Sequence, residues 1–276
     1  MHYFYTMNAI VHIPQNELRE AIDCCWYHEA GHMDQAWYSI PYLHQELILN
    51  LGDQFSITTA SQAFDYGPQG GLSGLYSRPM ITSVSGQYKA LGIILKPFGL
   101  YRLFGVHAPL LHQQLLRLDD ILGDKTQQLL LQLEDCAMPI EKIYTLERFI
   151  LAHARPQPIP EEILEAGHSS SLERGHIRSL QDNHHISPKK YIQTFHNVVG
   201  YTPKKYVQLH IVNAAIAQIA ATPDKALTEI AYDNGFYDQA HFIRVFRSFA
   251  GMTPMAYKKA VVAGKVNDTF PNTIRL

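Results

Sequence analysis

The sequence predicts an α+β N-terminal domain, a small β-sandwich or barrel with helices, followed by an all-α domain that contains two helix-turn-helix units. Three observations support this prediction. The 276 residues suit two domains of roughly 100–200 residues each. Short extended runs in the first half give way to helical spacing, and a motif near residue 200 recurs near residue 251. We therefore expect the first domain over residues 1–155 and the second over residues 156–276.

Extended runs separated by turn residues predict the strands of the first domain. Glycines at positions such as Gly52, Gly70 and Gly86 interrupt these runs. Many short strands with turns between them are typical of a sandwich or barrel. The predicted strands are Glu46–Leu51, Phe55–Thr59, Leu75–Ser77, Ile81–Val84 and Ala90–Lys96.

Apolar residues with helical spacing follow the strands, from about residue 115 to residue 150. We expect these helices to pack on the sheet or on a partner subunit, because each has one apolar face. The residues that make up these faces are Leu115, Leu118, Ile121, Leu122, Leu129, Leu130, Leu133, Ile143, Leu146, Phe149 and Ile150.

A proline-rich segment marks the domain boundary. The three prolines in Arg155–Pro160 lack an amide donor and disfavour a helix in the residue before each of them. Residues 1–169 contain 10 Lys and Arg against 18 Asp and Glu, whereas residues 170–276 contain 13 against 7. The second half is the one expected to bind a polyanion. The tail after about Gly264 is expected not to pack.

A repeat is the most specific feature of the second half. Gly200 to Tyr206 recurs as Gly251 to Tyr257, at an offset of 51 residues. In both copies a glycine can end one helix, a threonine can cap the next helix, and a proline suits its first turn. We expect helix-turn-helix units over about residues 160–205 and 206–260. The same offset relates the apolar core positions Tyr191, Phe195 and Val198 to Phe242, Phe246 and Phe249.

Exposed polar residues on the last helix of each unit are the candidate contacts with double-stranded DNA. Ser187 and Asp238 are expected to cap these two helices. Arg, Lys and Gln side chains pair with base edges or neutralise phosphates, and a major groove admits one helix. A plain helical domain with exposed charges is the alternative, which the repeat disfavours. The candidates are Lys189, Lys190 and Gln193 in the first unit and Gln239, His241, Arg244 and Arg247 in the second.

The second unit resembles the signature of the AraC/XylS family of transcription regulators. The resemblance rests on Ile230 to Phe242, which read Ile-Ala-Tyr-Asp-Asn-Gly-Phe-Tyr-Asp-Gln-Ala-His-Phe, and on Arg244, Phe246, Gly251, Thr253, Pro254 and Tyr257. It implies a sequence-specific regulator whose two units enter successive major grooves, with Lys189, Lys190, Gln193, Gln239, His241 and Arg244 on the recognition helices. The segments Trp26-Tyr27 and Ile94 to Val106 are similar to an N-terminal domain of some family members.

Two departures from the family pattern concern the first unit and the connecting helix. Gln181, His184 and His185 stand where the family usually has a small residue, an apolar residue and a turn glycine. The connecting helix, Tyr206 to Ala221, lacks the arginines that relatives carry, so phosphate contacts and the affinity that they add are reduced there. A first unit that only supports the second is therefore an open alternative.

Histidines and cysteines in the first half raise the alternatives of a metal site or an enzyme. His28, His32 and His44 could gather around a cation in a barrel, but no carboxylate or cysteine completes such a site. The adjacent Cys24 and Cys25 could accept alkyl groups, as in repair proteins with this DNA-binding domain, but the flanking zinc ligands are absent. We therefore predict no catalytic residues, no metal and no cofactor.

An effector pocket and a dimer interface remain as the two hypotheses for this half. A ligand-independent dimer could use the helices between Leu115 and Ile150, since symmetric dimers are the commonest oligomers. No segment has the ~18 apolar residues of a membrane span, and Met1–His12 lacks a signal pattern, so we expect a cytoplasmic protein. A small apolar or aromatic effector could instead bind between Trp26, Tyr27, Trp37, Tyr38, Tyr42, Phe55 and Phe64.

Overall fold

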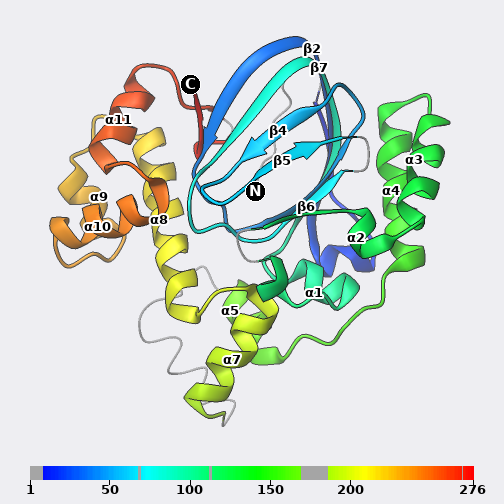
Figure 1. Cartoon of the computed structure of the whole chain (residues 1–276). Helices are drawn as coiled ribbons and strands as arrows, with labels where there is room; N and C mark the ends of the chain where they lie inside the picture. The colour runs from blue at the N-terminus through cyan, green and yellow to red at the C-terminus, as the bar shows by residue number, and fades with distance from the viewer. Residues whose placement is uncertain (1–8, 68–69, 112–113, 169–185, 269) are drawn as a thin grey trace.

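A curled antiparallel sheet forms the centre of the molecule, with two groups of helices on different sides of it (Figure 1). The computed structural model describes residues 9–67, 70–111, 114–168, 186–268 and 270–276. This is the predicted α+β arrangement, a β-rich first part followed by helices. In these residues the sheet contains β1 (Ala9–His12), β2 (Ile22–Ser39), β3 (Gln45–Asn50), β4 (Phe55–Thr58), β5 (Ala63–Tyr66), β6 (Gly71–Ser73), β7 (Met80–Leu95), β8 (Leu115–Arg117) and β9 (Thr273–Arg275).

The long strands β2 and β7 make the sheet curl. The main strand order is β1-β2-β7-β3-β6-β8, and β4 also pairs with β7. The first half of β7 pairs with β4 and its second half pairs with β3, so one strand joins two sets of neighbours. The pairing of β2 with β7 shifts register between Ala30 and His32, and such a bulge bends a strand.

Three of the predicted strands need correction. The expected strand at Leu75–Ser77 is wrong, because this segment lies in a buried loop after β6, where its apolar residues pack without forming a ladder. The expected strands Ile81–Val84 and Ala90–Lys96 are one strand, β7. Gly86 does not interrupt this strand, since its φ of 131° suits a glycine and the adjacent Gln87 amide donates to Asp53 at 2.7 Å.

Helices α1 (Gly99–Phe104), α2 (Asp119–Leu122), α3 (Lys125–Glu134) and α4 (Pro139–His153) belong to the first part of the chain. The apolar faces of α3 and α4 pack on the outer face of the sheet, against Cys25, Leu47 and Leu91 among others. This confirms the prediction that these faces are buried, and shows that they cover the protein's own sheet. Leu115 departs from the prediction, since it lies in β8.

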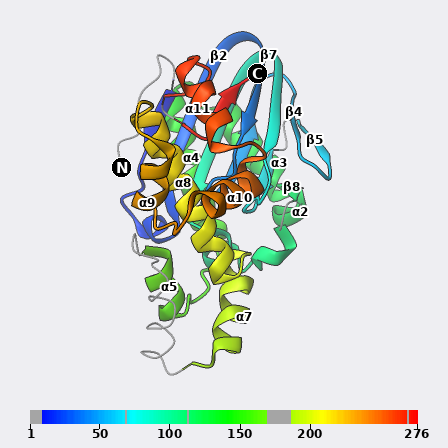
Figure 2. The ribbon, with the colours of Figure 1, turned by 90° about the vertical axis from the view of Figure 1, so that its left-hand side faces the viewer.

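The second half is helical and lies beside the sheet, with α8 running along it (Figure 2). Its helices are α5 (Glu161–His168), α7 (Pro188–Val199), α8 (Pro203–Ala221), α9 (Leu227–Asp233), α10 (Gln239–Ala250) and α11 (Pro254–Val262). The helices from α7 through α11 share one apolar core, which also includes Ile40 and Leu75 of the sheet domain. The family departures at Gln181, His184 and His185 lie outside the described residues.

The tail after Gly264 is packed, so the expectation of a loose tail is wrong. Thr273, Ile274 and Arg275 form β9, which pairs with Ser39, Tyr38 and Trp37 of β2. Ile274 is buried, as is Asn272, whose amide donates to the carbonyls of Ile40 and Pro41. A strand of three residues has no periodicity to reveal it in the sequence.

None of the described helices has both the length and the apolar composition that crossing a bilayer requires.

Candidate functional site

The two repeated turns have the same geometry. Gly200 and Gly251 have φ values of 91° and 68°, in the left-handed region that favours glycine. The Thr202 hydroxyl accepts from the Lys205 amide at 3.4 Å, and the Thr253 hydroxyl accepts from the Ala256 amide at 3.2 Å. The predicted succession of helix end, cap and new helix is therefore confirmed in both copies.

The helix α10 presents a polar outer face and a buried aromatic stripe. The Asp238 carboxylate caps it by accepting from the His241 amide at 2.7 Å, as expected. Phe242, Phe246 and Phe249 are buried, which turns the opposite face of the helix to solvent. On that face Gln239, Arg244 and Arg247 are exposed, whereas His241 is half-buried with its ring against Phe236 at 5.4 Å.

The arginines of α10 are free to contact a ligand. Neither Arg244 nor Arg247 forms an ion pair with any residue that the structure describes. Two guanidinium groups on one exposed helix face, without an ion pair to the described part of the chain, suit a polyanion, since each can donate several hydrogen bonds in a fixed geometry. The arrangement can contact both phosphates and base edges.

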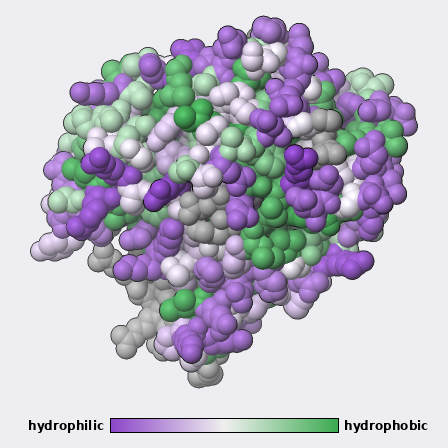
Figure 3. Space-filling view, viewed as in Figure 1, coloured by the Kyte–Doolittle hydropathy of each residue, from purple (hydrophilic) through white to green (hydrophobic). Residues whose placement is uncertain are grey.

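The helix α7 has the same design in the first unit. The Ser187 hydroxyl caps it by accepting from the Lys190 amide at 3.3 Å, as predicted. Tyr191, Phe195 and Val198 are buried. Its outer surface is largely hydrophilic, at the bottom of the view in Figure 3. The candidates Lys189, Lys190 and Gln193 are all exposed there.

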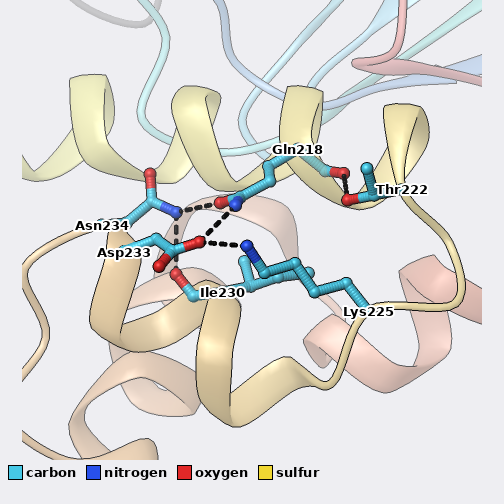
Figure 4. Close-up of polar contacts among 6 residues, drawn as sticks. All are labelled: Gln218, Thr222, Lys225, Ile230, Asp233 and Asn234. Atoms are coloured by element: carbon cyan, nitrogen blue, oxygen red, sulfur yellow. Dashed lines mark hydrogen bonds and ion pairs between the residues drawn. The ribbon is translucent and has the colours of Figure 1, made fainter.

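A polar network holds α9 on the connecting helix α8 (Figure 4). The Gln218 amide donates to Asp233 at 2.6 Å and accepts from the Asn234 amide at 2.7 Å. Lys225 forms an ion pair with the same Asp233 carboxylate, and its hydrogen bond lowers the pKa of that carboxyl. The network fixes the orientation of the second unit relative to α8, and sequence analysis did not find it because its members lie on three separate segments.

Tyr237 is a further candidate that sequence analysis missed. It precedes the cap of α10, and 85% of its surface is exposed. An exposed tyrosine hydroxyl beside a recognition helix can donate to a phosphate oxygen. The signal in the sequence is its place next to Asp238, in the turn of the predicted unit.

The connecting helix offers little positive charge. The exposed positions along α8 include Ala214, Ala217 and Ala221, and they carry no arginine. Lys204 and Lys205 lie in its first turn, where Lys205 is over the ring of Tyr201 at 4.9 Å. The lack of arginines along this helix therefore affects an exposed surface rather than a buried one.

The sheet encloses a cavity of about 360 Å³ on its inner face. Trp26, Tyr27, Trp37, Tyr42 and Phe55 line it, as the effector hypothesis expected. Tyr38 and Phe64 do not. Tyr38 turns toward the helical domain and donates to the Ala250 carbonyl at 2.8 Å, and Phe64 packs on the edge of Tyr66 at 4.8 Å.

The histidines and cysteines that are candidates for metal or thiol chemistry lie apart or are buried. Within the described residues no three His, Cys, Asp or Glu side chains form a metal-binding group. His32 is exposed, whereas His28 and His44 line the cavity, each against a tyrosine ring. Cys24 and Cys25 are buried, and burial raises the pKa of the Cys25 thiol, which makes it a poor nucleophile.

Two family models match the sequence. Residues 180–260 match a family described as a helix-turn-helix domain, and residues 10–117 match a domain of unknown function (DUF6597). Solved structures of ToxT from Vibrio cholerae share 10–12% identity. One gives a TM-score of 0.45 and covers 84% of this chain and 98% of that one. Another, with a bound unsaturated fatty acid, gives 0.44 and covers 92% and 95%.

Two relatives are similar over part of the chain. An uncharacterized HTH-type transcriptional regulator from Haemophilus influenzae is 25% identical over 87 residues, which are 31% of this chain and 28% of that protein. The bifunctional transcriptional activator and DNA repair enzyme AdaA from Bacillus subtilis is 31% identical over 94 residues, or 34% and 43%. This chain thus matches less than half the length of either relative. The match of residues 180–260 to a helix-turn-helix domain confirms the predicted resemblance of this part of the chain to the AraC type.

Proposed function

We propose that this chain is a sequence-specific DNA-binding transcription regulator of the AraC type, and that a small molecule bound in the cavity of the sheet controls it. The observation that supports DNA binding is that the two units contain equivalent capped helices, α7 and α10. Each has a buried apolar stripe and an exposed polar face. Two such helices on one chain suit two adjacent segments of the major groove, about one helical turn apart. A regulator of this kind acts in the cytoplasm, where the DNA is.

Arg244 is proposed to read a base, because it lies on the exposed face of α10, just after the capped first turn of the helix. Replacing Arg244 with alanine should weaken operator binding by ~1–3 kcal/mol, as the loss of a bidentate pair with a guanine does. Binding to random duplex should weaken much less. The measurement is a titration of both duplexes by fluorescence anisotropy, after the operator has been identified by capture of genomic fragments.

Lys190→Ala provides the comparison for Arg244→Ala. Lys190 is exposed at the start of α7 and is proposed to contact a phosphate. Its removal should weaken both duplexes alike and reduce the steepness of the salt dependence by about one released counterion. Equal losses on both duplexes for Arg244→Ala would exclude base recognition by Arg244.

The control of DNA binding by the cavity is proposed to pass through the C-terminal strap, residues 265–268 and 270–276. The strap follows α11 directly, and its Asn267, Phe270 and Thr273 line the cavity. It is also bound to the helical domain, since the Tyr257 hydroxyl donates to the Pro271 carbonyl at 2.7 Å. A ligand that displaces the strap would therefore disturb the contact between the two domains.

The sheet domain contacts both helix-turn-helix units at the same repeated turn. A side chain on Gly200 would meet Ala108, at 3.2 Å, and a side chain on Gly251 would meet the Tyr38 hydroxyl and Pro79. Asn272 of the strap donates to Asn213 of α8 at 3.0 Å. These contacts hold the two recognition helices in one arrangement, which lowers the cost of ordering them on DNA.

Ile274→Asp tests this coupling. The substitution puts a charge into the buried side of β9, so the strap should detach. We expect operator affinity to fall about threefold or more, because the helical domain loses part of its fixed arrangement. Arg275→Ala, at the exposed neighbouring position, is the control and should leave affinity unchanged. Equal affinities of the two variants would contradict a role for the strap.

An enzymatic role is not part of this proposal. AdaA combines regulation with DNA repair, and the adjacent cysteines of this chain invite the comparison. Cys24 and Cys25 are both buried, however, and the raised pKa of Cys25 keeps its thiol protonated. Homodimer formation stays a prediction, for which the faces of α3 and α4 are not available, since they cover the sheet.

A further inference from the structure

The cavity of the sheet has aromatic walls that are packed in place. Trp26 of β2 lies opposite Gly92 of β7, and a side chain on Gly92 would come within 2.3 Å of the indole ring. The glycine therefore allows the tryptophan to lie across the inner face of the sheet. The ring of Tyr88 packs on two other rings, with 5.8 Å between its centroid and that of Phe55 and 5.4 Å between its centroid and that of His28. The walls therefore present ring faces and edges that pack against one another.

One acidic side chain, Glu46, lies among these rings. It lines the cavity from β3, and the Trp26 indole is hydrogen-bonded to it. No lysine or arginine is among the described residues that line the cavity, and none of the described residues forms an ion pair with Glu46. A carboxylate has more acceptor sites than one indole can fill, so Glu46 has capacity for a further donor.

The other titratable groups around Glu46 supply no positive charge. Burial lowers the pKa of His44 to about 4 and also lowers the pKa of His28, so both imidazoles are neutral near pH 7. Burial raises the pKa of Tyr42, Tyr76 and Tyr88, which stay protonated. The cavity is thus a site of negative potential whenever Glu46 is ionised.

A buried hydroxyl in the wall of the cavity also lacks a partner among the described residues. The Tyr76 hydroxyl is buried and has no hydrogen bond to any described residue. Tyr76 lines the same cavity as Glu46, and the Glu46 charge contributes to the raised pKa of this phenol. Buried polar groups normally have partners, so an unpaired hydroxyl in the same cavity as a carboxylate with free acceptor sites favours a ligand with more than one N–H or O–H group.

We propose that the cavity binds a small organic cation, an ammonium group attached to an apolar or aromatic body. Its charge pairs with Glu46, its remaining N–H groups face the Tyr76 hydroxyl, and the rings of Trp26 and Tyr88 surround it. Aromatic faces attract cations, most strongly in a desolvated site. The volume lies within the range of about 300–1,000 Å³ found for small-molecule sites. This inference deepens the proposed control by an effector.

The charge of the ligand distinguishes this proposal from a generic apolar pocket. An apolar ligand without charge would leave Glu46 unpaired in a more desolvated site, and burying an unpaired charge is costly. An anionic ligand would meet the carboxylate at close range with no cation to offset the repulsion. Affinity should therefore follow the order cation, neutral molecule, anion for ligands of equal shape.

The test uses three probes with the same body on the full chain: 4-phenylbutylamine, 4-phenylbutanol and 4-phenylbutanoate. Their affinities are measured by isothermal titration calorimetry at pH 8, where Glu46 is ionised. We expect the amine to bind about tenfold or more tightly than the alcohol, as for a charge pair in a partly desolvated site, and the carboxylate not to bind detectably. Glu46→Gln should remove this preference, so that amine and alcohol bind alike. Glu134→Gln, on the exposed side of α3, is the matched control and should bind the probes like the unaltered chain.

The results separate this inference from the proposed function, because operator binding is measured on the same preparation. Equal binding of the three probes, tighter binding of the carboxylate, or no binding of any probe at millimolar concentration would overturn the organic cation. None of these outcomes affects a result showing specific DNA binding. Preference for the amine in a chain that binds no DNA would support the cavity site and refute the regulator.

Discussion

Phe246→Ala is expected to destabilise the chain by ~3–5 kcal/mol and to remove operator binding at physiological temperature. Phe246 is fully buried. The centroid of its ring lies 5.7 Å from that of Phe242 and 6.0 Å from that of Tyr257. Removing it leaves a cavity under the face that presents Arg244, so α10 would lose its fixed position. The measurement is urea denaturation followed by circular dichroism, together with operator titration.

Ile243→Ala is the control for this prediction. Ile243 is on the same helix, but 36% of its surface is exposed, so its truncation should cost less than about 1 kcal/mol. Phe195, the repeat-equivalent residue of the first unit, is also buried and contacts Tyr206 at 5.5 Å. Phe195→Ala should therefore cost about as much as Phe246→Ala. A small loss of stability on replacing either phenylalanine with alanine would contradict the shared design of the two units.

The second half of the fold was predictable because its signals are local. A cap, a core position and a turn glycine each depend on residues within a few positions, as for Asp238, Phe242 and Gly251. The repeat supplied these signals twice, at the same offset. The exposed residues of α7 and α10 followed from the core stripe, since a helix that buries one face must expose the other.

The sheet was less predictable because its signals depend on distant partners. Beyond Ala30, β2 is exposed or half-buried on both faces, so its residues show no alternation that would indicate a strand. The strand β9 has three residues and forms because β2 offers an open edge near Tyr38. Five of the seven aromatic residues expected around an effector line the cavity, whereas Tyr38 and Phe64 do not, and Tyr76 and Tyr88 were not expected. The contact between Gly92 and Trp26 joins two strands that are far apart in the sequence. Glu46 could not be singled out from the sequence, because an acidic residue at the start of a strand is ordinary. Only the fold brings it into one cavity with Trp26.

The stability of the ligand-free chain should fall as the pH rises from about 4.5 to about 7, relative to that of Glu46→Gln. Burial raises the pKa of Glu46 from its ordinary value of 4.5 to about 7. In this window the folded chain binds a proton that the unfolded chain has lost, so folding becomes less favourable as the pH increases. Above pH 7 the penalty is complete, and below 4.5 it vanishes, because both states are then protonated.

The size of this effect follows from the shift. One pKa unit corresponds to 1.36 kcal/mol, so the penalty at pH 8 is at most about 3 kcal/mol. Glu46→Gln should therefore be more stable than the unaltered chain at pH 8 and equally stable at pH 4. Subtracting the two unfolding curves at each pH removes the contribution of His44, whose lowered pKa affects both proteins alike. A difference that does not change with pH would show that Glu46 titrates normally and is not desolvated. If the difference appears, 4-phenylbutylamine should reduce it by pairing with the carboxylate, which links the pH dependence of folding to the charge of the proposed ligand.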